Sequence, residues 1–308
     1  MHEQTVLVIG EVFIDTHLDI IDENGPLVRL GGIFHSARAF ASLGQNYALA
    51  YYAPDYLDDD INRWSFYLHT KGCYKLGCIN KTPNVMLINE SKEAGDQGYY
   101  NIIKDQAEFT DIEAIENILS IVNPSDILIF PGRYDTAKLL KSLNGFIGKV
   151  HIDFHYDSEN LSESICREIE TIILSTSSEF FKTTCRGTVD GLVEYFGKRN
   201  IHQFLVKENR GGSFCYIPSI EEQYEAPSYY VPTMHSVGVG DVYNAIFISA
   251  IYGTDITKRM RFAALCAAKY AETMSYDKYQ ENVHLVYDRK LQLQIEHLGN
   301  RVAGDQAA

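Results

Sequence analysis

The stretch HSVGVGDVYNAIFISAIYG, residues 235–253, places two glycines, Gly238 and Gly240, directly before an acid, Asp241, and an apolar run at helical spacing. One interpretation is a turn followed by the capped start of a helix. The other is a pocket of backbone N–H groups that binds an anion at a helix N-terminus, with Asp241 placed to accept a proton. The remainder of the sequence is needed to choose between them.

That remainder predicts an α/β fold, because short apolar runs typical of buried strands alternate with amphipathic helical segments. The runs lie at 5–10, 126–130, 149–154, 171–176 and 203–207. Such alternation predicts a doubly wound, mostly parallel sheet with helices on both faces.

Short β-like pieces interrupt this alternation at about 12–30 and 73–103, and we expect them to form a small β-lid. The sequence shows no internal repeat or credible linker. We therefore expect a single α/β domain over 1–300, followed by a flexible tail over 301–308.

Composition excludes several classes of function. The formal net charge of the 308-residue chain is −14, which disfavours nucleic-acid binding because that relies on basic side chains displacing counterions. No signal-peptide pattern and no long apolar run are present, so we expect a cytoplasmic protein that does not bind membranes. The six cysteines are scattered without a second pair at zinc-ligand spacing, which favours reduced thiols.

Residues 235–241 resemble the C-terminal signature D-T-x-G-A-G-D of ribokinase-like (PfkB-type) carbohydrate kinases. Here the run reads HSVGVGD, so both glycines and the last acid are kept. His235 replaces the first acid, and Val239 replaces the alanine. The resemblance implies that Gly238, Val239 and Gly240 shape an anion hole and that Asp241 is the catalytic base.

A second signature of that family, Gly-Gly followed by an Asn and a helix ending in Leu-Gly, resembles GGIFHSARAFASLG at 31–44. His35 stands where the Asn is expected, and it either alters substrate choice or only packs. Asp15, in GEVFID, stands where the family has an acid that holds substrate hydroxyls. The resemblance thus implies a substrate site formed by Asp15, Gly31, Gly32 and His35.

Two weaker matches follow in the order expected of the family. The family's N-x-x-E is degraded to TSSE at 176–179, which implies that Glu179 helps to hold Mg²⁺. Its T-x-G-x-x-G turn reads KENRGG at 207–212. The residues implied on the nucleotide side are Lys207, Asn209, Gly211 and Gly212.

Together these matches imply a phosphotransferase with an alcohol acceptor, a carbohydrate kinase that uses ATP and Mg²⁺ on a sugar or sugar-like molecule. The family's lid closes over the sugar, and an exposed edge of such a sheet permits a homodimer. Two alternatives remain open: a nucleoside kinase of the same fold, and an inactive relative that binds a sugar or nucleotide. An NAD-binding oxidoreductase is disfavoured because the first strand does not lead into G-x-G-x-x-G.

Two further groups of side chains leave alternatives open. In HIDFHYD, the side chains of His151, Asp153, His155 and Asp157 would share one face of a strand. They could form a metal site, or Asp153 alone could face the ligand. Arg133 follows a strand end, where it would meet an anionic substrate group or form a surface salt bridge.

Overall fold

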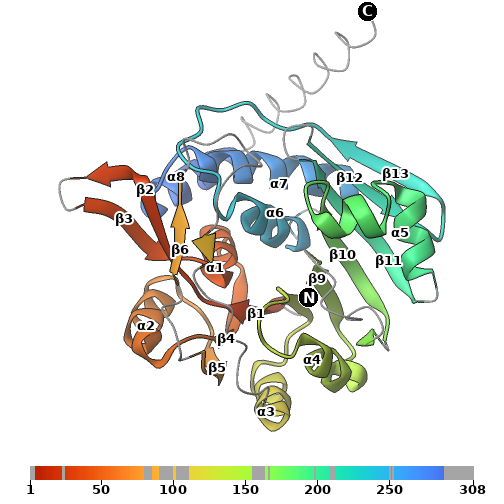
Figure 1. Ribbon diagram of the computed structural model, residues 1–308, viewed down its shortest axis with the longest axis horizontal. Coiled ribbons are helices and arrows are strands. Elements are labelled where there is room, and N and C mark those ends of the chain that lie inside the picture. Colours follow the sequence, from red (N-terminus) through yellow and green to blue (C-terminus); the bar gives the residue numbers. More distant parts are fainter. Residues whose placement is uncertain are drawn as a thin grey trace, which may run out of the picture.

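The computed structural model describes residues 4–22, 25–79, 85–89, 100–101, 111–154, 164–165, 167–197, 199–208, 212–249, 251 and 253–287. Within this part of the chain, nine strands form a large sheet and four form a small one (Figure 1). In spatial order, the large sheet contains β13 (Glu222–Ala226), β12 (Gly212–Ile217), β11 (Ile201–Glu208), β10 (Ile169–Ser175), β9 (Lys149–Asp153), β8 (Asp126–Ile129), β1 (Thr5–Glu11), β4 (Asn46–Tyr52) and β5 (Cys73–Gly77).

The large sheet is parallel from β5 to β11, and β12 alone runs in the opposite direction, so it pairs antiparallel with both β11 and β13. From β1 the chain builds β4 and β5 on one side and then crosses to build β8 to β11 on the other. This reversal places a topological switch point between β1 and β8. Ligands in such sheets bind beyond the carboxyl ends of the strands near this point. The predicted mostly parallel, doubly wound sheet is confirmed.

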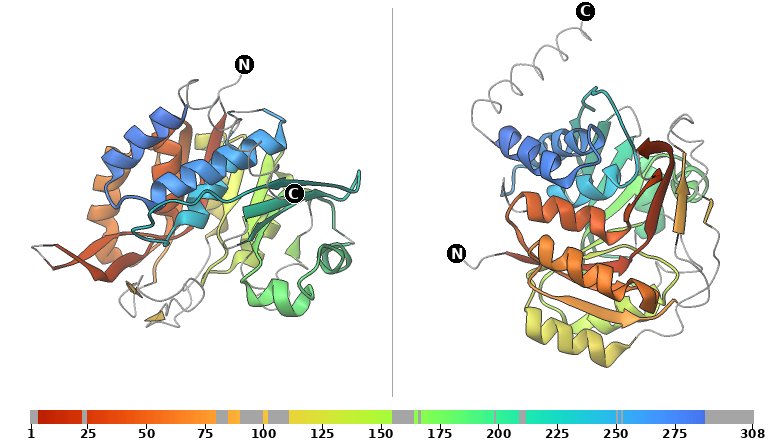
Figure 2. Two further views of the ribbon diagram at one scale, coloured as in Figure 1. Left: turned by 90° about the horizontal axis from the view of Figure 1, so that it is seen from above. Right: turned by 90° about the vertical axis from the view of Figure 1, so that its left-hand side faces the viewer.

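Helices cover both faces of the large sheet (Figure 2). Along β1 the side chains alternate, so Val6 and Val8 join one hydrophobic cluster while Leu7 and Ile9 join the other. The first cluster is completed by α1 (Ile33–Ser42), α2 (Asp58–Tyr67), α6 (Val239–Ile248), α7 (Ile256–Ala271) and α8 (Tyr276–Tyr287). The second is completed by α3 (Ile112–Val122), α4 (Thr136–Ser142) and α5 (Val189–Phe196).

The small sheet has the order β3-β2-β6-β7 and stands apart from the large one. Its strands are β2 (Ile14–Asp22), β3 (Gly25–Leu30), β6 (Val85–Ile88) and β7 (Tyr100–Asn101). The expected lid range 73–103 therefore divides, because β5 pairs with β4 at the edge of the large sheet. That part of the expectation was wrong: a short β-like segment does not itself reveal which sheet it joins. We call the small sheet the lid sheet.

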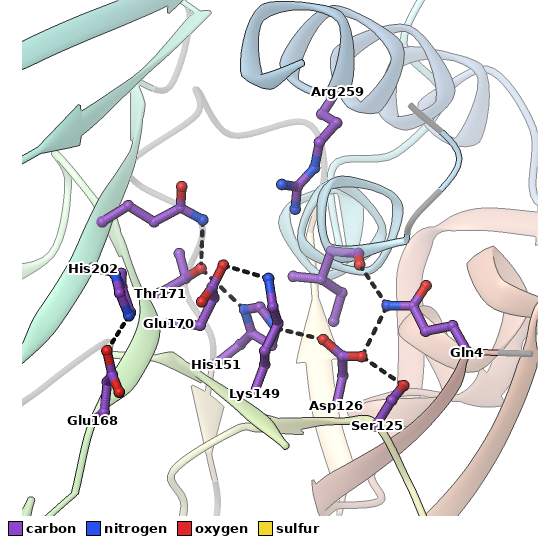
Figure 3. Close-up of polar contacts among 12 residues, drawn as sticks. Gln4, Ser125, Asp126, Lys149, His151, Glu168, Glu170, Thr171, His202 and Arg259 are labelled. Carbon is purple, nitrogen blue, oxygen red and sulfur yellow. Dashed lines mark hydrogen bonds and ion pairs between the residues drawn. The ribbon is translucent and has the colours of Figure 1, made fainter. Parts of the chain in front are cut away.

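A row of buried polar side chains crosses the large sheet near the amino-terminal ends of its strands (Figure 3). His151 contacts Thr171 Oγ1 through Nδ1 at 3.0 Å and Asp126 Oδ1 through Nε2 at 3.3 Å. Gln203 donates to Thr171 Oγ1 at 2.8 Å, and Gln4 donates to Asp126 Oδ2 at 3.0 Å. These contacts offset the cost of burying polar groups, which is large when no partner is present.

In the described residues, no helix is long and apolar enough to span a bilayer.

Candidate active site

The loop before α6 turns on a glycine that cannot be replaced without strain. Gly238 is the N-cap of α6 and has φ 76°, in the left-handed region that favours glycine. A Cβ at this position would also overlap the imidazole ring of His35. The absence of a side chain is thus required twice, once by the backbone and once by a neighbour from α1.

The first turn of α6 consists of Val239, Gly240 and Asp241. Its backbone N–H groups face outward from the helix start, where the macrodipole favours negative charge. The Val239 N–H donates to the Ser236 carbonyl at 3.4 Å, which is a long contact. Asp241 is half-buried, and its carbonyl accepts a hydrogen bond from Ser36 Oγ at 3.2 Å. Ser36 was not foreseen, although it follows His35 directly.

A lysine lies beside this helix start. The Nζ atom of Lys207, at the end of β11, is 3.3 Å from the place of a Cβ on Gly240. Lys207 Nζ donates to Asn244 Oδ1 at 3.1 Å and lies 3.4 Å from Asp153 Oδ2. Asn244 Nδ2 donates to the same carboxylate oxygen at 2.5 Å. The structure thus brings Lys207 to the predicted anion hole, with Asp153 facing the same site.

The other residues predicted to bind the nucleotide and Mg²⁺ have fewer contacts with this site. Thr176 N–H donates to the Lys207 carbonyl at 2.9 Å, so the turn after β10 lies beside β11. Glu179, in that turn, is exposed. Gly212 opens β12, while Asn209 and Gly211 lie outside the described residues.

The predicted substrate residues form a buried cluster on the other side of Gly238. His35 Nε2 lies 2.9 Å from Asp15 Oδ2, and His35 Nδ1 lies 2.8 Å from the Tyr270 hydroxyl. A Cβ on Gly31 would overlap the Asp15 carboxylate. Gly32, with φ 61°, lies against the Glu11 carbonyl in the same way. His35 is therefore packed tightly and also bonded to the predicted substrate acid.

The charges in this cluster follow from its burial. Desolvation lowers the pKa of His35 to about 4 despite its contact with Asp15, so the ring is neutral near pH 7. Burial alone would raise the pKa of Asp15, but His35, Arg29 and Arg38 outweigh it and the net shift is downward. Because a carboxylate only accepts hydrogen bonds, His35 carries its proton on Nε2, and Nδ1 accepts from Tyr270.

Two more histidines complete this buried cluster. Burial lowers the pKa of His17 to about 4, and burial together with Arg29 lowers that of His235 to about 3. The His17 and His235 rings meet edge-on at 6.1 Å, and His235 contacts the Tyr270 ring at 5.0 Å. His17 gave no signal in the sequence beyond its place on an expected lid strand.

At the switch point, Glu11 ends β1 and Arg133 follows β8. Arg133 donates to Glu11 Oε2 from Nε at 2.8 Å and from Nη2 at 2.5 Å, and its backbone N–H donates to Oε1. Only 12% of the Arg133 side chain and 3% of the Glu11 side chain are exposed. The ion pair is therefore buried, and the surface salt bridge considered from the sequence was wrong. Glu11 itself was missed.

The HIDFHYD segment offers no metal centre in the part of the chain that is described. His151 bonds within the polar row, Asp153 faces Lys207, and residues 155 and 157 lie outside the described ranges. Across the described ranges, no three His, Cys, Asp or Glu side chains are grouped as metal ligands.

Comparison with solved structures identifies the fold. A ribokinase from Giardia lamblia matches with a TM-score of 0.70 at 13% identity, over 93% of this chain and 99% of that chain. Arabidopsis thaliana ribokinase, complexed with ribose and ATP, matches with 0.62 at 15% identity, over 91% and 98%. A putative ribokinase II from E. coli, complexed with ATP and Mg²⁺, matches with 0.66 at 13% identity, over 91% and 99%.

No protein-family model and no curated protein matches the sequence. At the identities given above, the structural likeness shows the fold, which is ribokinase-like α/β as the sequence signatures implied.

The double requirement for glycine at 238 leads to a first prediction. Gly238→Ala should lower the free energy of unfolding in two ways. Holding alanine in the left-handed backbone conformation costs roughly 1–2 kcal/mol, and overlap of its Cβ with His35 costs roughly 1–3 kcal/mol more. Gly253→Ala is the matched control, because Gly253 has φ 55° but no atom within 4 Å of its Cβ position. Urea denaturation measures both, and equal losses in the two variants would contradict the tight His35 contact.

The buried neutral histidines predict a pH dependence of stability. Their folded-state pKa values of about 3 to 4 lie below the ordinary 6.5, so the unfolded chain binds more protons as the pH falls. Stability should be fully present above pH 6.5 and be lost progressively toward pH 4. Each histidine contributes a slope of at most about 1.4 kcal/mol per pH unit.

Denaturation of His17→Phe between pH 7 and pH 5 tests this origin, because phenylalanine keeps an apolar ring and removes the titration. The slope of unfolding free energy against pH should be shallower than in the wild type. His284→Gln, which changes an exposed histidine on α8, should keep the wild-type slope. An unchanged slope in His17→Phe would contradict the assignment.

Proposed function

We propose that this chain catalyses the ATP-dependent phosphorylation of a hydroxyl group on a sugar or sugar-like small molecule. The observation that carries the proposal is the meeting of three features at one helix start. These are the Gly238 turn, the acid Asp241 in the first turn of α6, and the ammonium group of Lys207 beside Gly240. The ribokinase-like fold, seen in neighbours solved with ribose, ATP or Mg²⁺, supports it.

In this reaction the chain aligns the reactants and compensates charge. N–H groups at Val239, Gly240 and Asp241 would receive the oxygens of the transferred phosphoryl group, and Lys207 would add a positive charge beside them. Asp241 would take the proton of the acceptor hydroxyl while the hydroxyl oxygen attacks the γ-phosphorus. The bond from that phosphorus to the β–γ bridging oxygen then breaks, and ADP leaves.

The donor groups fit a magnesium ion held mainly by phosphate. Mg²⁺ is usually bound by one or two carboxylates, with waters and substrate phosphates completing its shell. Glu179, an exposed carboxylate in the turn after β10, suits such a role, and Thr176 of that turn bonds the Lys207 backbone. When bound, the ion would neutralise phosphate charge.

The acceptor would be held on the lid side of Gly238. Asp15 is ionised, as its lowered pKa requires, and can accept hydrogen bonds from hydroxyl groups. His35 donates to Asp15 and fixes its orientation, so the residue replacing the family's Asn would act by positioning that carboxylate. A nucleoside acceptor fits the same chemistry through its ribose hydroxyls.

The homodimer through the lid sheet also remains a prediction. Leu18, Ile21 and Val28 are exposed on that sheet.

A second candidate is a relative that binds a sugar or nucleotide without turnover. The engagement of Asp15 with His35 and Arg29 inside a cluster where Asp15 is 2% exposed favours it. It is opposed by the presence of both an ammonium group, Lys207 beside Gly240, and an acid, Asp241, at one helix start.

The proposal is tested by measuring ADP release from magnesium-ATP across a panel of sugars, sugar acids and nucleosides. At least one acceptor should give turnover, and Asp241→Asn should lower its kcat by about 10²–10⁴-fold because the general base is lost. Glu113→Gln is the matched control, since Glu113 is also a first-turn acid, on α3.

The control should keep wild-type kcat while losing a similar helix-dipole interaction. Turnover that survives in Asp241→Asn would contradict the role of the base. Binding of a panel member, seen as a thermal shift, without any ADP release would favour the second candidate.

The position of Lys207 gives a separate prediction for nucleotide binding. Lys207→Met should weaken magnesium-ATP binding by about 10–100-fold, the usual value of a charge-assisted hydrogen bond. Lys149→Met removes an exposed, ion-paired lysine at the amino-terminal end of β9 and should leave affinity unchanged, because Lys207 lies at the carboxyl end of β11. Isothermal titration calorimetry measures both, and equal affinities in the two variants would contradict this placement.

A further inference from the structure

An arginine points inward from the edge strand of the lid sheet. The β2–β3 register sets Arg29 directly opposite Asp15 and Leu27 opposite His17. Asp15 and His17 are buried, whereas Val28, the neighbour of Arg29, is 57% exposed. Only 8% of the Arg29 side chain is exposed. The guanidinium group therefore lies inside the molecule, although its strand is an edge.

The contacts of this guanidinium reach the loop before α6. Arg29 Nη2 donates to the Val237 carbonyl at 3.2 Å and to His235 Nδ1 at 3.3 Å. Its Nε lies 3.9 Å from Asp15 Oδ2, and its Cζ lies 5.4 Å from the centre of the Tyr270 ring. One side chain thus joins the lid sheet, the residues before Gly238 and the end of α7.

The bond to Val237 acts on the peptide unit that enters the N-cap of α6. In a planar trans peptide the C=O and the following N–H point in opposite directions. With the Val237 carbonyl held toward Arg29, the Gly238 N–H is turned away from the buried cluster. The guanidinium therefore sets the orientation of the loop from which the first turn of α6 starts.

His235 relays the same constraint to α7. Its Nε2 lies 3.0 Å from the Thr273 carbonyl, which can only accept, so the ring proton is on Nε2. Nδ1 is then the acceptor that Arg29 requires. The backbone N–H of His235 also donates to the Ala271 carbonyl at 3.3 Å. The ring is fixed at both nitrogens, and Arg29 closes the connection.

We infer that Arg29 is a positioning residue for the anion site at the start of α6, and that it links the position of the lid sheet to the geometry of that site. The inference rests on the proposed function for its catalytic meaning. Its structural content, that the loop keeps its conformation only while Arg29 on β3 lies against it, is independent of that function.

A simpler role for Arg29 is protection of an edge strand, since inward-pointing charges discourage edge-to-edge pairing. Lysine would serve that role equally well. A single ammonium nitrogen could not make the whole set of contacts, because Nη2 of the planar guanidinium bonds Val237 and His235 while Nε faces Asp15. Arg29→Lys therefore separates the two roles, and Arg29→Met removes both.

The experiment measures amide hydrogen exchange over residues 236–241 in the ligand-free full chain, followed by calorimetric titration of magnesium-ATP. In Arg29→Met the exchange of this loop should speed up at least tenfold relative to the strands β8 to β11, and magnesium-ATP affinity should fall about tenfold. Arg29→Lys should lie between this variant and the wild type. Arg63→Met, which removes an exposed arginine on α2, should match the wild type.

Chemical rescue adds a second readout. Methylguanidinium should restore slow exchange of the loop in Arg29→Ala and have no effect on Arg63→Ala. If Arg29→Met does not fold, the comparison of Arg29→Lys with wild type decides alone. Unchanged loop exchange in the folded Arg29 variants would overturn the inference, as would a uniform increase across the whole chain, which would show only lost global stability.

Kinetics with an identified acceptor show whether Arg29 acts on the anion site at the start of α6 or on the acceptor site at Asp15. Loss of the anion-site geometry should lower kcat by about 10–100-fold, with the acceptor KM changed less than threefold. A raised acceptor KM with unchanged kcat would show that Arg29 acts through Asp15, and would overturn the inference. If wild type binds magnesium-ATP but phosphorylates no acceptor, the proposed function fails, while the exchange result still decides the role of Arg29.

Discussion

The close contact between the His35 ring and the backbone of Gly238 is the constraint on which the rest of this site depends. It brings α1, which carries His35, against the N-cap of α6. Because His35 is bonded to Asp15 and to Tyr270, the same contact ties the lid sheet and α7 to the helix start. The absence of a side chain at Gly238 is what lets these elements approach so closely.

Cations flank this helix start inside a strongly acidic protein. Lys207 lies beside Gly240, and Arg29 holds the carbonyl of Val237. With a net charge of −14, long-range attraction would not bring an anion to the chain. The proposed anion site therefore depends on local groups, and buried cations attract an anion more strongly than exposed ones because solvent screens them less. Asp153 and Asn244 hold Lys207 in this position.

Much of this architecture is readable from local sequence patterns, and the rest is not. Apolar runs such as 5–10 predict buried strands, and the two glycines before Asp241 predict the turn and helix start that the structure has. The links of Arg29 to Val237 and of Glu11 to Arg133 join residues more than 100 positions apart. They depend on which strands become neighbours, and no periodicity records that. The membership of β5 in the large sheet was missed for the same reason.

The most direct test of the account is a crystal structure of the chain with Mg²⁺ and a non-hydrolysable ATP analogue. The account predicts the terminal phosphate within hydrogen-bond distance of the Gly240 and Asp241 N–H groups and of Lys207 Nζ. It also predicts the Asp241 carboxylate on the side of that phosphate open to an acceptor. A nucleotide bound elsewhere on the chain, or a terminal phosphate with no contact to the start of α6, would contradict the account.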